Sequence, residues 1–236
     1  MTQPAQPAQT LILARCRCND AGHPLGLRNG DILLAVDGTP WVGSASELQD
    51  QLARSPRARQ LSFQRGDTVF SVLSDRADLG QWTRKILPEP LPPPPPADDR
   101  LRNWEIWADL ARNHDLFPAR ASWLALIAPP LWLAKSRLWA GLGLFGAVLA
   151  LCLPVGPWLM AGVWICTGVH LWGEGASHRR VALQMQGYVR QGVIAARSEA
   201  DAIAGWCKLS PEARFRFARP VTAPAANAAQ PESELG

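Results

Sequence analysis

The longest apolar stretch of the chain covers residues 138–173, which contain no Asp, Glu, Lys or Arg. A membrane-spanning helix needs about 20 apolar residues, so the stretch is too long for a single span. Two prolines and a glycine interrupt it at Leu153–Pro157, and such residues mark turns. The pattern predicts two transmembrane helices, Leu138–Leu153 and Trp158–Trp172, joined by a tight turn. Because each helix is short for a hydrocarbon core of about 30 Å, a hairpin inserted partway, one span and a buried core remain alternatives.

Small residues recur at a spacing of four within the first of these helices. Such spacing lets the backbone of another membrane helix approach closely. We therefore predict transmembrane packing through Gly143, Gly146, Ala147 and Ala150, against the second helix or in a homo-oligomer. The motif G-x-G-x-x-G at 141–146 does not predict nucleotide binding, because that fingerprint requires a preceding strand and a later acidic residue.

Basic residues flank the apolar stretch on both sides. Arg120, Lys135 and Arg137 precede it, and Arg179 and Arg180 follow it. Cytoplasmic flanks of membrane helices are enriched in Lys and Arg, and the chain opens without the pattern of a secretory signal. The sequence therefore predicts a multi-pass protein of the bacterial inner membrane with both termini in the cytoplasm.

The N-terminal third alternates apolar strips with turn residues. Leu11–Cys18 and Ile32–Val36 are predicted strands, and Asp37-Gly38 is typical of a tight reversal. Ser44 and Glu47 have the spacing of a capping box, which predicts that a helix starts there. Two further strands are expected around residues 61–63 and 69–73.

This succession resembles the bacterial PDZ domains of periplasmic serine proteases and membrane metalloproteases over about residues 10–75. The resemblance is carried by Gly26-Leu27, Gly30-Asp31, Asp37-Gly38 and the helix with its following strand. It implies a small β-sandwich or barrel that binds extended peptide ends at a sheet edge beside the helix. Leu48 and Leu52 would then line the groove, unless they belong to the core. In the family a glycine-containing loop and the receiving strand come before the strand at Leu11, and here we expect both to be missing.

The rest of the chain is predicted to be helical or extended. Pro92–Pro96 indicates a polyproline spacer, residues 101–110 have helical spacing, and Ala121–Ala134 is short for a span. Residues 181–209 read as amphipathic helices with a second cap at Ser198. The fold class is thus an α+β PDZ-like domain followed by an all-α membrane region. The predicted segments are a disordered N-terminus (1–9), the PDZ-like domain (10–86), a proline-rich linker (87–100), interfacial helices (101–137), the transmembrane hairpin (138–173), cytoplasmic amphipathic helices (174–219) and a disordered tail (220–236).

Charge and motifs narrow the chemistry. The net charge of +4 and the pI near 9.0 come from scattered basic residues beside the apolar stretch, so nucleic acid is not an expected partner. The five cysteines form no disulfide framework. His170 and His178 are judged too far apart along the chain for a helical metal pair. No catalytic motif is present, so we predict no enzyme activity, no metal and no cofactor.

The sequence therefore predicts a membrane-anchored, PDZ-like adaptor or scaffold that mediates protein–protein interaction at the inner membrane. Its expected partners are membrane lipid and other membrane or cytoplasmic proteins. The alternative is a subunit of a membrane transport or protein-quality-control complex that acts mainly through its hairpin.

Overall fold

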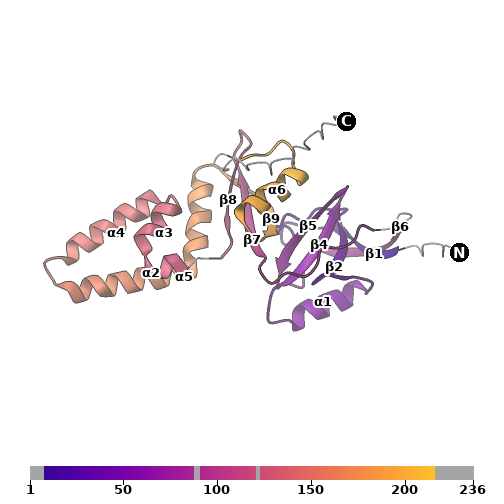
Figure 1. The fold of residues 1–236 in the computed structure, drawn as a ribbon, viewed down its shortest axis with the longest axis horizontal. Helices are drawn as coiled ribbons and strands as arrows, with labels where there is room; N and C mark the ends of the chain where they lie inside the picture. Colours follow the sequence, from indigo (N-terminus) through magenta and orange to yellow (C-terminus); the bar gives the residue numbers. More distant parts are fainter. Residues whose placement is uncertain (1–7, 88–90, 121–122, 216–236) are drawn as a thin grey trace, which may run out of the picture.

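The computed structural model describes residues 8–87, 91–120 and 123–215. Most of the expected disordered N-terminus and the whole expected tail lie outside these residues. Two β-sheets lie side by side, and a helical hairpin extends away from them (Figure 1).

The first sheet contains the four predicted strands and two more, β3 and β6. Its order is β5-β4-β2-β1-β6, with β3 paired to β2, and its pairs are antiparallel. The capping box before α1 is confirmed, because Ser44 accepts from the Glu47 N–H and the Glu47 carboxylate accepts from the Ser44 N–H. Neither β3 nor β6 was among the strands predicted from the sequence. The elements are β1 (Ala8–Arg15), β2 (Ile32–Val36), β3 (Thr39–Pro40), α1 (Ala45–Arg54), β4 (Arg59–Arg65), β5 (Thr68–Ser74) and β6 (Gln81–Leu87).

The second sheet corrects two predictions of helix. Residues 101–110 contain strand β7 and residues 181–209 contain strand β9, which pair with each other in antiparallel fashion. The apolar spacing misled because both strands are covered on two faces, so apolar residues follow one another instead of alternating. The cap at Ser198 is confirmed, since its side chain accepts from the Asp201 N–H. The order is β10-β8-β7-β9, with β7 (Arg102–Ala108), β8 (Asn113–Pro118), β9 (Val189–Ala196), α6 (Glu199–Leu209) and β10 (Arg214–Phe215).

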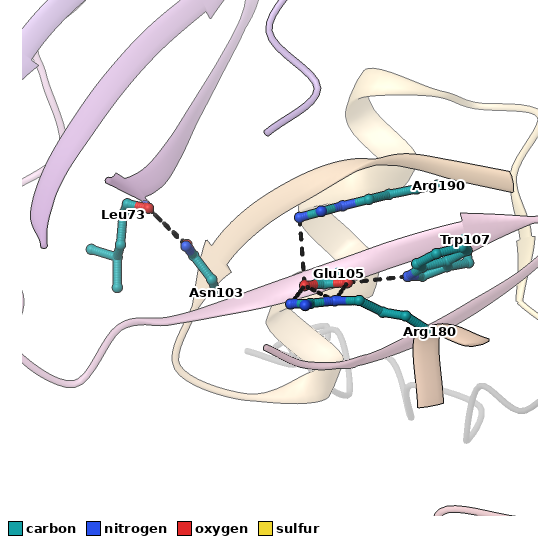
Figure 2. Close-up of polar contacts among 6 residues, drawn as sticks. All are labelled: Leu73, Asn103, Glu105, Trp107, Arg180 and Arg190. Carbon is teal, nitrogen blue, oxygen red and sulfur yellow. Dashed lines mark hydrogen bonds and ion pairs between the residues drawn. The ribbon is translucent and has the colours of Figure 1, made fainter. Parts of the chain in front are cut away.

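One hydrophobic core joins the two sheets. Phe63 of β4, Ile106 of β7 and Trp206 of α6 belong to the same buried cluster. At its rim the Asn103 side chain donates to the Leu73 carbonyl (2.7 Å, Figure 2) and accepts from the Leu73 N–H (2.9 Å). The core of the first sheet therefore continues into segments that were expected to be separate helices.

The proline-rich segment lies against the first sheet. The Gln60 side chain donates to the Pro96 carbonyl (3.3 Å) and accepts from the Asp98 N–H (3.1 Å). A Cβ on Gly38 would lie 2.4 Å from the Ala97 nitrogen. Residues 96–98 are thus held by the sheet, and they lead the chain from the first sheet to the second.

The apolar stretch forms a helical hairpin, as predicted, but the transmembrane prediction is wrong. α4 (Trp139–Cys152) has 14 residues, which is about 21 Å at 1.5 Å per residue. α5 (Pro157–Met185) is longer, yet its second half carries Glu174, Arg179 and Arg180 and changes direction to run beside the second sheet (Figure 1). Among the described residues no helix combines the length and the apolar character that crossing a bilayer requires. The multi-pass inner-membrane location, with its cytoplasmic termini, loses its basis with these spans.

Different glycines pack the hairpin from those expected. A Cβ added at Gly143 or Gly146 would meet no heavy atom within 4 Å, so that face of α4 does not contact α5. On α5, by contrast, a Cβ at Gly168 would lie 2.6 Å from the Leu126 carbonyl oxygen, and one at Gly175 would lie 2.7 Å from the Trp132 ring. Close helix contacts are therefore made by α5 with the short helices α2 (Trp123–Ile127) and α3 (Pro129–Lys135). The same face of α4 also carries Ala147 and Ala150, and its packing against another chain stays a prediction.

A buried carboxylate fastens α5 to the second sheet. Glu105 is 1% exposed and lies between Arg180 and Arg190 (Figure 2). Arg180 donates to both Glu105 oxygens, the shortest contact being 2.5 Å, and the Trp107 indole donates to one of them at 3.3 Å. Hydrogen bonding to Glu105 raises the pKa of the Arg180 guanidinium, whereas burial lowers the pKa of Arg190. These contacts fix the direction in which the hairpin leaves the sheets.

Candidate functional site

The candidate site is a cavity of about 350 Å³ between α1 and the start of β6. Ala45 and Gln49, one turn apart on α1, form one wall. The opposite wall is the beginning of β6 with the loop that precedes it. The lining residues are Arg17, Asp20, Ala45, Gln49, Asp78, Gly80, Gln81 and Trp82.

The loop before β6 is held in one conformation by its neighbours. The Leu79 side chain is fully buried in the core, and the Ala21 N–H donates to the Asp78 carbonyl at 2.8 Å. Gly80 has a φ of 133°, which L side chains rarely adopt, and a Cβ there would lie 2.7 Å from the Arg15 carbonyl oxygen. Glycine is therefore required at the point where the chain turns into β6.

Strand β6 presents an open sheet edge to this cavity. It pairs with β1 from Gln81 to Leu87 and ends the strand order of the first sheet. Alternate N–H and C=O groups of such an edge strand lack a ladder partner. An extended peptide can use these groups by adding as a further strand.

The polar groups at the loop end of the cavity carry more negative than positive charge. Asp20 and Asp78 lie there with Arg17, and the Asp20 carboxylate accepts from the Arg17 backbone N–H at 2.6 Å. Nearby, burial raises the pKa of the Cys16 thiol, and the Asp20 and Asp31 carboxylates add to the effect. This end of the cavity therefore favours a cationic group over an anionic one.

Trp82 supplies the apolar surface of the site. Its ring stacks on Phe63 at a centroid distance of 6.3 Å, which anchors it to the core. Its indole Nε1 is buried and has no hydrogen-bond partner among the described residues. A buried donor without an acceptor is costly, so a ligand carbonyl that reaches it would be stabilised.

The residues expected to bind a peptide lie elsewhere. Leu48 and Leu52 are each 1% exposed and belong to the shared core, so the face of α1 that carries them is covered by the first sheet. The neighbouring face, with Ala45 and Gln49, borders the cavity instead. The glycine-containing loop was sought before Leu11, but Asp78-Leu79-Gly80 comes after the last strand of the expected pattern. The sequence signal for this loop and strand was weak, since Gly80 directly precedes β6 but the residues of β6 do not alternate between apolar and polar.

Two histidines are closer than their spacing suggested. The Nε2 atoms of His170 and His178 are 2.9 Å apart, although the two residues are eight positions apart on α5. One ring donates to the other, and both side chains are exposed. Within the residues that the structure covers, no third His, Cys, Asp or Glu joins them in a group suited to a metal ion.

The hairpin itself carries a large exposed apolar surface. Trp158 at its turn is 89% exposed, and Leu144 and Leu151 of α4 are more than half exposed.

Comparison with known proteins found no matching family model, no matching curated protein and no matching solved structure. The interpretation of the cavity between α1 and β6, and of the hairpin, therefore rests on their geometry and chemistry.

Proposed function

We propose that the protein is a non-catalytic adaptor that binds an extended segment of another protein in the cavity between α1 and β6. The observation that carries this proposal is the open edge of β6 beside a cavity that begins at a fixed glycine loop. Backbone groups of β6 would hold the peptide by strand addition, and the cavity would select one of its side chains.

The PDZ resemblance supports the proposal in a rearranged form. In that family a glycine-containing loop precedes the strand that receives the peptide, and the strand lies opposite a helix. Here Asp78-Leu79-Gly80 precedes β6, and α1 forms the opposite wall. The loop and strand follow the rest of the domain along the chain instead of preceding it, while β6 pairs with β1 in space.

The charge of the cavity indicates which peptides it would accept. A peptide with a free C-terminal carboxylate would place a negative charge near Asp20 and Asp78, and like charges at short range are unfavourable. A Lys or Arg side chain at the same place would be attracted to both carboxylates. We therefore assign an internal or C-terminally blocked segment with a basic residue as the preferred ligand.

The test measures binding of ten-residue peptides to the full chain by fluorescence anisotropy. The peptides that bind should contain a basic residue, and amidation of their C-terminus should leave the affinity unchanged. Gln49→Trp should fill the cavity and weaken binding by roughly tenfold or more, because the lost contacts include a buried side-chain pocket. Ala53→Trp, a matched change at an exposed position of α1 outside the cavity, should bind as the wild type does.

Two outcomes would contradict the proposal. If Gln49→Trp binds the selected peptides with wild-type affinity while its thermal melt shows it folded, the peptide does not occupy this cavity. If binding is abolished by amidation, the site recognises a terminal carboxylate, and the assignment of a basic ligand to Asp20 and Asp78 is wrong.

A further inference from the structure

A second cavity, of about 300 Å³, lies where the hairpin meets the second sheet. Strand β8 forms one side, with Asp115, Leu116, Phe117 and Pro118. The end of α3 and the start of the bent half of α5 form the other side, with Trp132 and Gly175 among their residues. This cavity is separate from the proposed peptide site between α1 and β6, which lies on the first sheet.

Positive charge prevails around this cavity. Four basic residues and two acidic residues line it, together with three large aromatic side chains. The basic residues come from three different segments, so only the folded chain brings them together. They are Arg120, Lys135, Arg137 and Arg179, the acidic residues are Asp115 and Glu199, and the aromatic residues are Trp104, Phe117 and Trp132.

Arg179 is the buried cation of this group. Its side chain is 14% exposed, it lies over the Phe117 ring, and it donates to the Ser136 carbonyl at 3.1 Å and to the Asp115 carboxylate at 3.2 Å. Its Nε is buried without a hydrogen-bond partner among the described residues. Burial lowers the pKa of the guanidinium, Asp115 opposes this shift, and the charge of Arg137 adds to it. The positive charge of Arg179 is therefore only partly compensated by the protein.

We infer that this cavity binds a phosphate monoester group. Such a group carries about 1.5–2 negative charges near neutral pH and three acceptor oxygens, which matches an excess of two positive charges on the lining. Arg and Lys side chains are the usual donors to phosphate oxygens. The aromatic side chains leave an apolar wall for the remainder of the ligand. The group could be presented by a free phosphorylated small molecule or by a lipid headgroup, and both share this chemistry.

The experiment titrates the full chain with glycerol 3-phosphate, a soluble monoester, and follows heat release at low ionic strength. The test variant is Arg120→Gln with Lys135→Gln, because both residues are exposed and neither side chain makes a hydrogen bond or ion pair within the part of the chain that the structure describes. Loss of two charged donors should weaken binding by roughly tenfold or more. The control is Arg54→Gln with Arg57→Gln, which removes the same charge from exposed positions near the end of α1 on the first sheet.

A second arm distinguishes the two sources of the group. Vesicles of phosphatidylcholine with phosphatidic acid, whose headgroup is a phosphate monoester, are mixed with the protein in a sedimentation assay. Binding that glycerol 3-phosphate displaces would assign the site to the headgroup, and binding of the soluble monoester alone would assign it to a free ligand. The inference is overturned if the wild type binds neither probe, or if the Arg120/Lys135 variant binds as tightly as the wild type. It is also overturned if the Arg54/Arg57 control loses as much affinity as the Arg120/Lys135 variant.

Discussion

At the scale of single residues, the structure depends on a few charges that are removed from water. Glu105 is the clearest example, because its carboxylate accepts from Arg180 and Trp107 and forms an ion pair with Arg190. Removing one partner of a buried ion pair is strongly unfavourable, since the remaining charge keeps its desolvation penalty. This arrangement could not be predicted from the sequence, because a glutamate between tryptophans in an expected helix would ordinarily face solvent.

The first prediction follows from this burial. Glu105→Gln keeps the shape of the side chain but leaves Arg180 and Arg190 without a counter-charge, so the free energy of unfolding should fall by about 3–5 kcal/mol. Urea denaturation followed by tryptophan fluorescence would measure the change. Glu212→Gln is the control, because Glu212 pairs with Arg112 at an exposed position where ion pairs contribute little. Equal stability of the two variants would show that the Glu105 cluster does not hold α5 in place.

At the scale of elements, glycines report which helix faces are in contact. Gly168 faces the Leu126 carbonyl, whereas Gly146 faces open space. The sequence analysis assigned the helix contacts to α4, because small residues repeat there at a regular spacing of four. The contacts are made by α5 instead, since α2 and α3 fold back onto it, and a local spacing rule does not contain that long-range fact.

This difference predicts opposite effects of one substitution. Gly146→Ala should stabilise the protein by up to about 1 kcal/mol, because alanine is the better helix former. Gly168→Ala should instead destabilise it by about 1–3 kcal/mol, because the new methyl group would overlap the Leu126 carbonyl oxygen. Thermal melts of the two variants beside the wild type would compare them. If both variants gain stability, α2 does not pack on α5 as described.

The extent of correct prediction differs between the two sheets for a physical reason. The first sheet is built from neighbouring segments with turns at Asp37-Gly38 and Gly66, so local alternation and capping located β2, β4, β5 and α1. Strands β7 and β9 are separated by the whole hairpin, and their pairing satisfies backbone groups that a local pattern assigns to a helix. The cavity between α1 and β6 was missed for a related reason, because β6 pairs with β1 although the two strands lie at opposite ends of this part of the sequence.

At the scale of the whole molecule, the shared core predicts that the two sheets unfold together. Ile106 of β7 is fully buried in the cluster that contains Leu33 and Phe63 of the first sheet. Ile106→Ala should therefore remove about 2–5 kcal/mol of stability, and it should raise amide exchange rates in β2 and β4 as much as in β7. Leu110→Ala is the control, because that side chain is 99% exposed and its loss should change neither sheet. If β2 and β4 keep wild-type protection while β7 loses it, the sheets have independent cores, and the groove at β6 could then be studied on the first sheet alone.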